Sequence, residues 1–516
     1  MPPEHWVDRG VGLSVATIPA LVEHAGRTFG DAEAVVDGGR RVSFAELAAM
    51  VRRAAAGCAA AGVTRGDRVA VWGPNSLEWL VAALGAVSAG GALVPLNTRF
   101  KAEEAGYILD KSGAALTFVA PPFLGNDYPA MVGDRRSMLL GEALWTSYDE
   151  ATPVRVEPDD TGDIIFTSGT TGRPKGVMTT HAQTLRVFDT WADVVGLAQG
   201  DRYLVVNPFF HTFGYKAGII ACLLRGATIV PQPVFDVPTT LELIERERIT
   251  VLPGPPTLYQ SILDAPGRAD RDLSSLRLAV TGAAVVPVAL VERMRSDLTF
   301  ATVLTAYGLT ESTGTVTMCR PDDDPVTIAT TSGRAIPDTE VRVVDGDGRP
   351  LAAGEPGEVV VRGYNVMQGY FEDPPATAQA IDGDGWLHTG DIGVLDAAGN
   401  LRITDRLKDM YVVGGFNAYP AEIEQVLATH PAVAESAVVG MPDERLGEVG
   451  KAFVVARPGV AVEGDELIEW CRERMANYKV PRAVEVVASL PRNASGKVLK
   501  VELRAPAGAT SSAVGG

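Results

Sequence analysis

Two kinds of sequence pattern alternate along the chain up to about residue 400. Short runs rich in Val and Ile predict strands, and longer stretches rich in Ala and Leu predict helices. Several of the runs end in Gly, Pro or small polar residues, which is typical of α/β layers with binding loops at the strand ends. The predicted strands are 68–73, 164–169, 202–208, 228–233, 250–256 and 277–284.

One apolar stretch, residues 79–97, is long enough to raise the question of a membrane span. It is interrupted by Gly85, Ser88, Gly90 and Gly91. These breaks predict a buried helix, a Gly turn and a strand, and we expect no membrane span.

The pattern changes near residue 338, where hairpin strands with Asp-Gly turns are predicted. A charged break follows near residue 405. Beyond it, helices are predicted at 420–430 and 464–478, and strands at 433–443 and 450–459. We therefore expect a large N-terminal domain of layered α/β subdomains over 1–405, a hinge at 406–408 and a small mobile α+β lid domain over 409–504. The small, polar residues 505–516 predict a disordered tail.

Composition adds limits on the class of protein. A chain of 516 residues is too long for a single core. Its formal net charge of −18 argues against a nucleic-acid partner or an anionic membrane surface. The cysteines are scattered without a CxxC pair, which predicts reduced thiols in a cytoplasmic protein. They are Cys58, Cys222, Cys319 and Cys471. The N-terminal residues show no signal peptide.

The stretch 166–177, FTSGTTGRPKGV, combines glycines, hydroxyls and Lys175 after an apolar strand. Glycine lets the backbone approach a ligand, and hydroxyl, N–H and ammonium groups bind oxyanions. The stretch therefore predicts a phosphate site. It is not a Walker A loop, because Arg-Pro separates Gly172 from Lys175.

Three further motifs carry little information singly. In AYGLTES (306–312) an aromatic can stack on a base and Thr-Glu can bind phosphate and metal, but a capped helix start fits equally. In WLHTGDIG (386–393) Asp391 is either a ribose ligand or an ordinary turn residue. In LPRNASGKVLK (490–500) Lys497 follows Ser-Gly on a predicted mobile loop, where a single lysine is most often solvated.

Taken together and in this order, the motifs resemble the adenylate-forming superfamily of acyl-CoA synthetases, firefly luciferases and nonribosomal adenylation domains. The resemblance covers roughly residues 15–504 and includes DRLKD at the charged break. It implies a large N-terminal adenylate-forming domain and a small mobile C-terminal domain. It also implies ATP, Mg²⁺ and CoA, with formation of an acyl-AMP and then a thioester.

The resemblance assigns roles to matching positions. It implies a loop over the β- and γ-phosphates made of Thr167, Ser168, Gly169, Thr170, Thr171, Gly172 and Lys175. It implies an adenine site made of Gly282, Ala283, Ala284 and Tyr307. Thr310 would bind the α-phosphate and Glu311 would hold Mg²⁺, while Asp391 and Arg406 would bind the ribose. Lys497 would bridge the carboxylate and the α-phosphate.

The hinge region agrees with the superfamily only in part. Lys408 matches the hinge position, and Gly415 is retained, which would let pantetheine pass close to the backbone. Many relatives carry a lysine shortly after the hinge. Here no Lys or Arg lies between Lys408 and Asn417, which puts a role for such a lysine in doubt.

Residues 207–219 and 250–261 predict a rigid pocket with aromatic and proline walls, suited to a compact or cyclic acid. His211 matches the gate of the acyl pocket in the superfamily, and Lys216 either reaches polar atoms of the acid or is solvated. The expected pocket residues are His211, Phe213, Tyr215, Lys216, Gly254, Pro255 and Gly308.

Within the superfamily, segments such as HTFGYKAGI and MYVVGGFNAYPAEIEQVLA resemble the actinobacterial ligases that activate an indanedione propanoate left by sterol-ring degradation. This predicts an acid–CoA ligase. The alternatives are an amide ligase joining a bicyclic or aryl acid to an amino acid, as coronafacic acid ligases do, and a standalone enzyme loading a carrier protein. A non-catalytic binder is disfavoured by Lys175, Glu311 and Lys497. Dimers are common among relatives, so a homodimer stays open.

Overall fold

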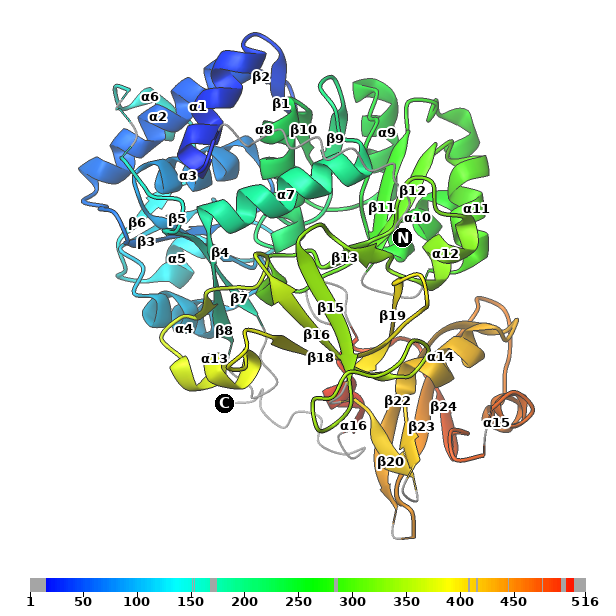
Figure 1. Ribbon diagram of the computed structural model, residues 1–516. Helices are drawn as coiled ribbons and strands as arrows, with labels where there is room; N and C mark the ends of the chain where they lie inside the picture. The colour runs from blue at the N-terminus through cyan, green and yellow to red at the C-terminus, as the bar shows by residue number, and fades with distance from the viewer. Residues whose placement is uncertain are drawn as a thin grey trace, which may run out of the picture. The chain divides into compact units, whose positions relative to one another are not determined.

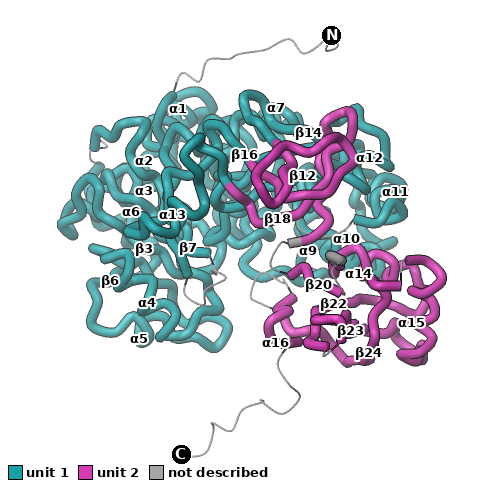
Figure 2. Tube along the Cα trace, turned by 60° about the horizontal axis from the view of Figure 1, so that its bottom comes forward, with its two compact units in different colours: residues 1–341, 361–387 teal, residues 342–360, 388–516 magenta. Residues whose placement is uncertain are grey.

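The computed structural model describes residues 15–150, 152, 154–167, 174–282, 286–406, 409–413, 416–443, 445–475, 477–492 and 498–504. The chain divides into two compact units (Figure 2). The first consists of residues 1–341 and 361–387, and the second of residues 342–360 and 388–516. Both mix helices and strands, as predicted. The hinge expected at 406–408 is a statement about movement and stays a prediction.

A seven-stranded sheet dominates the first unit. Its order is β17 (Gly369–Tyr370), β8 (Lys175–Thr180), β7 (Thr161–Thr167), β4 (Ala92–Leu96), β3 (Arg68–Trp72), β5 (Leu116–Val119) and β6 (Ser137–Leu139). The strands from β7 to β6 pair in parallel, whereas β8 and β17 add an antiparallel edge. In β3 and β4, side chains on both faces are buried, as parallel strands require.

Two four-stranded sheets complete the strands of this unit. One has the order β2 (Arg40–Ser43), β1 (Glu33–Asp37), β10 (Thr228–Pro231), β9 (Arg202–Val205). The other has the order β11 (Leu278–Gly282), β12 (Thr302–Tyr307), β13 (Thr317–Met318), β14 (Arg334–Ala335). Val251 joins them through isolated bridges to Tyr203 of β9 and Leu278 of β11.

The strand predicted at 250–256 is only partly formed. Val251 makes isolated bridges, and the N–H groups of Leu252 and Gly254 donate to Leu278 and Val280 of β11 at 3.0 Å, but Pro256 already begins helix α10 (Pro256–Leu263). Pro253, Pro255 and Pro256 have no N–H to donate, so the segment forms no regular ladder. The other five of the six strands predicted between residues 68 and 284 match β3, β7, β9, β10 and β11.

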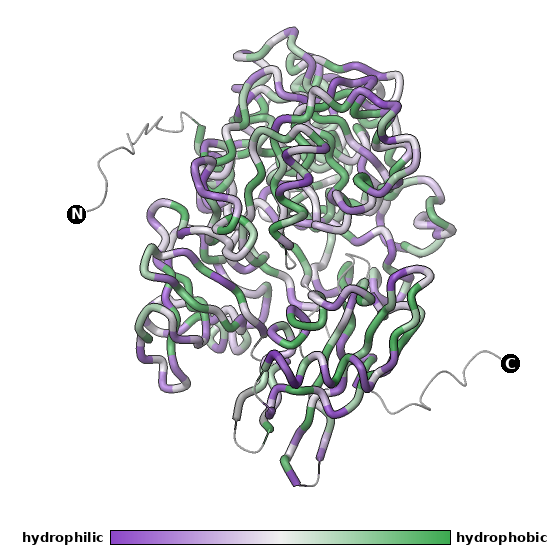
Figure 3. Tube along the Cα trace, turned by 90° about the vertical axis from the view of Figure 1, so that its right-hand side faces the viewer, coloured by the Kyte–Doolittle hydropathy of each residue, from purple (hydrophilic) through white to green (hydrophobic). Residues whose placement is uncertain are grey.

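Helices pack around these sheets (Figure 1). Those of the first unit are α1 (Ile18–Phe29), α2 (Phe44–Ala60), α3 (Leu77–Ser88), α4 (Ala102–Ser112), α5 (Tyr128–Val132), α6 (Ala143–Thr146), α7 (His181–Val195), π-helix η1 (Phe213–Ile220), α8 (Ala221–Arg225), α9 (Val237–Glu247), α10, 3₁₀-helices η2 (Arg268–Asp270) and η3 (Thr310–Ser312), α11 (Val288–Asp297), α12 (Pro325–Thr330) and α13 (Pro374–Ala380). Figure 3 shows hydrophobic stretches among the packed elements and hydrophilic stretches along many outer turns.

Local sequence signals explain several boundaries. A reciprocal capping box of Ser43 and Glu46 begins α2, and one of Thr180 and Gln183 begins α7. The apolar stretch 79–97 is helix α3, a turn with Gly90 at φ +88°, and strand β4, as predicted. Gly90 tolerates this left-handed conformation because it has no Cβ.

The second unit contains two sheets. One has the order β15 (Thr339–Val344), β16 (Gly357–Gly363), β18 (Leu387–Leu395), β19 (Leu401–Arg406). The other has the order β21 (Phe416–Ala418), β20 (Tyr411–Val413), β23 (Gly447–Ala456), β22 (Val433–Asp443), with β24 (Ala483–Val486) beside β23. Its helices are α14 (Pro420–Ala428), α15 (Gly464–Arg472) and α16 (Lys500–Arg504).

The predictions for residues 409–504 hold with shifted ends. The predicted strand 433–443 is β22, whereas α15 stops at Arg472 rather than reaching residue 478. All four cysteines are buried and unpaired, as expected. Within the described ranges, no helix is both long and apolar enough to cross a membrane.

Candidate active site

The base of the predicted phosphate loop is a hairpin between β7 and β8. Thr167 at the end of β7 lies opposite Lys175 at the start of β8. The Tyr107 hydroxyl donates a hydrogen bond to the carbonyl of Pro174, 3.3 Å away, directly before Lys175. The hairpin therefore brings both ends of the loop to one point. The remaining predicted loop residues, Ser168 to Gly172, lie outside the described residues.

Glu311, the predicted metal ligand, lies near this base. It belongs to the one-turn helix η3, shortly after β12. Its Oε1 accepts a hydrogen bond from the Tyr370 hydroxyl at 3.0 Å, and Lys175 Nζ lies 5.0 Å from the centre of the Tyr370 ring. Burial, and then the neighbouring Glu311 carboxylate, raise the pKa of Tyr370, so its hydroxyl is the donor. Lys175 and Glu311 thus both contact one tyrosine, Glu311 at its hydroxyl and Lys175 over its ring.

Mg²⁺ would need other ligands besides the Glu311 carboxylate. Among the described residues, no group of three or more His, Cys, Asp or Glu side chains could hold a metal ion alone. Mg²⁺ is commonly held by one or two carboxylates together with substrate phosphates and water. Glu311 beside the base of the phosphate loop matches that donor set.

The predicted adenine residues Gly282 and Tyr307 end two neighbouring parallel strands. Gly282 of β11 pairs with Ala306 of β12, the residue before Tyr307. A Cβ at Gly282 would overlap the carbonyl oxygen of Ala306, so this close approach requires glycine. The two residues are therefore brought together as expected. Ala283 and Ala284 lie outside the described residues.

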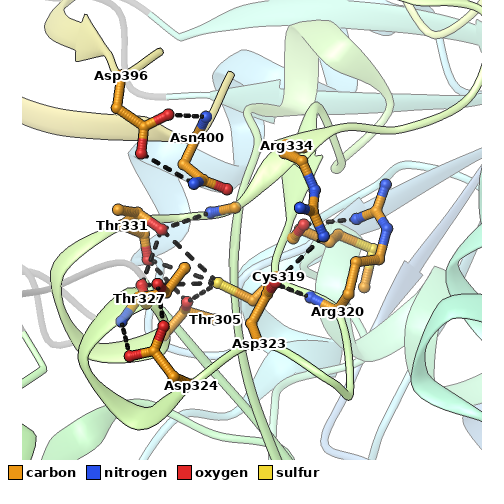
Figure 4. A network of polar contacts seen from close by, with 12 residues as sticks. Thr305, Cys319, Arg320, Asp323, Asp324, Thr327, Thr331, Arg334, Asp396 and Asn400 are labelled. Carbon is orange, nitrogen blue, oxygen red and sulfur yellow. Dashed lines mark hydrogen bonds and ion pairs between the residues drawn. The ribbon is translucent and has the colours of Figure 1, made fainter. Parts of the chain in front are cut away.

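A buried polar network around Thr305 links β12 to the segments packed against it. The Thr305 hydroxyl lies 2.8 Å from the carbonyl oxygens of Ile328 and Thr331, and 3.0 Å from the Cys319 sulfur. Figure 4 shows Thr305, Cys319, Thr327 and Thr331 grouped around these contacts. The network ties α12 to the strand that carries Tyr307. Cys319 is thus a packing residue with its thiol among hydroxyl and carbonyl oxygens.

The predicted acid-pocket residues fall on and around η1. Gly308 packs against Gly314, and Gly314 packs against Thr212, so the turn containing Thr310 touches the segment before η1. Gly254 donates its N–H to the Val280 carbonyl at 3.0 Å, two residues before Gly282. The structure therefore gathers the described phosphate, adenine and acid-pocket predictions within the first unit. Pro255, also predicted there, is exposed at the N-cap of α10.

His211 and its neighbours differ in their exposure. His211 is exposed, while Phe213 is half-buried and Tyr215 fully buried. Desolvation by the protein packed around its ring lowers the pKa of His211. Its Nδ1 accepts the Phe213 N–H at 3.3 Å, which fits a neutral ring protonated at Nε2. A neutral, partly open imidazole suits a gate beside an apolar pocket.

The Lys216 side chain is buried and is not solvated. Its Nζ lies 3.0 Å from Asp163 Oδ1 and 2.7 Å from Thr179 Oγ1, and both charged side chains are almost completely buried. Burial lowers the pKa of Lys216, and the Asp163 carboxylate offsets only part of this effect. The solvated alternative was wrong. The Lys216 ammonium is already bound by Asp163 and Thr179. A direct contact between Lys216 and the acid stays a prediction.

Sequence reasoning missed Asp163 and Tyr370. Asp163 had a readable signal, since it is the lone charged residue of strand β7. Tyr370 had none, because its partner Glu311 is 59 residues away along the chain.

The predicted ribose pair lies in the second unit. Asp391 of β18 lies directly opposite Arg406 of β19 in the antiparallel register. The predicted turn at this motif lies inside strand β18. There Gly390, directly before Asp391, has a left-handed backbone with φ +67°. Glu358 binds the His388 ring at 2.9 Å and the Gly390 N–H at 3.1 Å, which holds this irregular backbone. The side chain of Arg406, together with Lys408, Gly415 and Lys497, lies outside the described residues.

An open hollow of about 510 Å³ lies elsewhere on the first unit. Arg65, Arg68, Asp160 and Phe371 line it, and no predicted site residue does. Arg65 is already paired with Asp160 at 2.7 Å. We assign this hollow no part in the chemistry.

Comparison with known proteins decides the family. The profile of AMP-binding enzymes matches residues 22–371, and that of the AMP-binding enzyme C-terminal domain matches residues 422–497. The chain belongs to the AMP-binding enzyme family. The predicted superfamily and fold class are thereby confirmed.

Three members of this family are notably similar. The 7a-methyl-1,5-dioxo-octahydroindenyl propanoyl:CoA ligase of Rhodococcus jostii (strain RHA1) is 52% identical, and its namesake from Mycobacterium tuberculosis (strain ATCC 25618 / H37Rv) is 54% identical. Each match covers 95% of this chain and 98% of the relative. The solved structure of the anthranilate CoA ligase AuaEII with anthranoyl-AMP has a TM-score of 0.86 at 28% identity, covering 95% of this chain and 96% of that one.

Proposed function

We propose that the protein is an ATP-dependent acid–CoA ligase whose acid is a bicyclic indanedione propanoate of sterol degradation. One observation carries the choice of acid. Two ligases named for a methyl-dioxo-octahydroindenyl propanoate are 52% and 54% identical over 95% of the chain. The neighbouring structure that holds an acyl adenylate supports the two-step route through acyl-AMP.

In the first step, a carboxylate oxygen of the acid attacks the α-phosphorus of ATP, and pyrophosphate leaves. Because anions are brought together, catalysis depends on positioning and charge neutralisation. In this proposal Lys175 and Thr167 at the loop base bind the β- and γ-phosphates, and Thr310 binds the α-phosphate. Mg²⁺ on Glu311 would supply further neutralisation.

The second unit contributes the remaining roles in this proposal. Asp391 and Arg406 are assigned to the ribose, and Lys497 to the bridge between the carboxylate and the α-phosphate. In the second step the CoA thiol attacks the acyl carbon and AMP leaves. Movement about Lys408 would withdraw Lys497 and let pantetheine pass Gly415. These assignments rest on the resemblance of the motifs.

The acid pocket supports a compact ring system. Tyr215 and most of η1 are buried, burial lowers the pKa of His211, and Lys216 is held by Asp163. The described walls thus offer apolar and aromatic surface, and the Lys216 ammonium is already paired. Such a pocket fits a bicyclic diketone better than a second carboxylate.

The reaction would take place in the cytoplasm, where ATP and CoA are available and four unpaired cysteines stay reduced. The small-molecule partners are the acid, ATP and CoA.

Pyrophosphate release with mass spectrometry of the products tests the proposal. The panel contains the indanedione propanoate, benzoate, octanoate and a coronafacate-like acid, each with CoA or with an amino acid. We expect the indanedione propanoyl thioester to form well above all others. Equal or better turnover of octanoate would refute the assignment of the indanedione propanoate as the substrate. Pyrophosphate without thioester, but with an amide when an amino acid is added, would show an amide ligase instead.

A further inference from the structure

Tyr370 contacts both charged groups that the proposed function assigns to the phosphates and the metal. Its hydroxyl donates to Glu311 Oε1 at 3.0 Å, and its ring lies 5.0 Å below Lys175 Nζ. We propose that Tyr370 is a positioning residue for adenylation, which orients the Glu311 carboxylate toward the metal–nucleotide complex and holds Lys175 at the loop base. The proposal rests on the function proposed above.

The backbone of Tyr370 is fixed to the strand that carries Lys175. Tyr370 in β17 pairs with Val177 in β8, and the Phe371 N–H donates to the Gly176 carbonyl at 2.7 Å. On the other side, the Tyr370 N–H donates to the Thr377 hydroxyl at 2.9 Å. The ring therefore keeps a constant place beside the loop base.

The same short segment also holds the turn of Glu311. The Met367 N–H donates to the Glu311 carbonyl at 2.9 Å, three residues before Tyr370. Glu311 is thus bound twice by one segment, through its backbone and through its side chain.

The two contacts of Tyr370 have separate consequences. A hydrogen bond to Oε1 leaves Oε2 of Glu311 available as a metal ligand in a fixed orientation. Groups that orient a metal ligand in this way contribute about 10- to 100-fold to metal affinity. The ring face attracts the Lys175 ammonium without consuming its N–H donors, which stay available for phosphate.

Two substitutions separate these contacts. Tyr370→Phe removes the hydroxyl and keeps the ring, whereas Tyr370→Leu removes both. Tyr364→Phe is the matched control, because Tyr364 also bonds a neighbour, Thr190, at 3.4 Å and carries Arg186 on its ring at 3.9 Å. It differs in lying away from Lys175 and Glu311.

The measurement is the Kd of a non-hydrolysable ATP analogue, with Mg²⁺ and with EDTA, in the absence of acid. For Tyr370→Phe we expect the Kd with Mg²⁺ to rise about tenfold or more, with the EDTA value unchanged. Tyr370→Leu should raise both values, and Tyr364→Phe neither. Conversion of supplied acyl adenylate with CoA should be unaffected in Tyr370→Phe.

An equal rise with and without Mg²⁺ in Tyr370→Phe, or no change in either, would overturn the proposal. Urea unfolding of the same samples shows whether a variant is merely less stable, which would shift both Kd values together. If the wild-type protein binds the analogue with Mg²⁺ but releases no pyrophosphate with any acid, the proposed function fails while the role of Tyr370 is still measured.

Discussion

At the scale of single residues, the buried pair of Lys216 and Asp163 joins two segments with predicted site residues. Asp163 lies in β7, which leads into the predicted phosphate loop, and Lys216 lies in η1, close in sequence to the predicted gate His211. Their side chains are 0% and 1% exposed, so neither charge can be solvated if its partner is lost.

Lys216→Met should therefore be strongly destabilising. It leaves the Asp163 carboxylate buried with only hydroxyl partners, at a cost of about 3–5 kcal/mol. The double variant Lys216→Met/Asp163→Asn removes both charges while the amide can still bond Thr179, and should recover part of the loss. Urea unfolding of both variants measures this. A double variant no more stable than Lys216→Met would contradict a charge-pair origin.

His181 predicts a dependence of stability on pH. Burial lowers its pKa from the ordinary 6.5 to about 4, and the Asp160 carboxylate offsets only part of the effect. Because the unfolded chain binds this proton more tightly, stability should fall as pH drops from 6.5 toward 4, by about 3 kcal/mol at most.

His181→Asn should flatten this part of the curve of unfolding free energy against pH. His24→Asn, a change on the partly exposed side of α1, serves as the control and should keep the wild-type slope. Chemical unfolding at several pH values between 7.5 and 4 gives the three curves. Parallel curves for all three proteins would show that His181 is not responsible.

At the scale of elements, η1 is placed by close contact with the segment before it. A Cβ at Gly214 would overlap the Pro208 carbonyl oxygen, so η1 can approach this turn only with glycine there. The turn carries Phe209, whose N–H is held by Asn75 Oδ1 at 2.7 Å. This hydrogen bond holds the turn in place, so a side chain at position 214 would displace η1 instead.

Gly214→Ala should shift η1 and cost about 1–3 kcal/mol of stability. The KM for the acid should rise more than the KM for ATP, because the pocket moves while the hairpin of β7 and β8 does not. Gly39→Ala, where a Cβ would meet no atom within 4 Å, is the control. Steady-state kinetics and thermal unfolding test both variants, and equal changes in the two KM values would speak against this account.

At the scale of the whole molecule, the proposed reaction divides between two half-reactions. Lys497 is assigned to the first half alone, since it lies far along the chain from the other motifs and beyond the charged break. Lys497→Ala should lose adenylation, measured as pyrophosphate release. It should still convert supplied acyl adenylate with CoA. If both halves fell equally, the division would be wrong.

Local pattern was sufficient where neighbouring residues decide the structure. Residues 79–97 break into α3, a turn and β4 at their own glycines, and 433–443 coincide with β22. The local pattern was only partly right at 250–256, where Val251 forms bridges but the prolines lack donors for a regular strand.

The sequence by itself determined the family, the order of the motifs and the residue types of the site, because these depend on residues close together along the chain. Only the tertiary structure decided which side chains meet. Tyr370 reaches Glu311 across 59 residues, and Lys216 reaches Thr179 across 37. Such contacts arise when separate strands and helices pack around a shared core, and no local spacing encodes them. The burial that makes Lys216 one half of an ion pair, where the sequence left open a contact with the acid or a solvated side chain, is likewise a property of the packed fold.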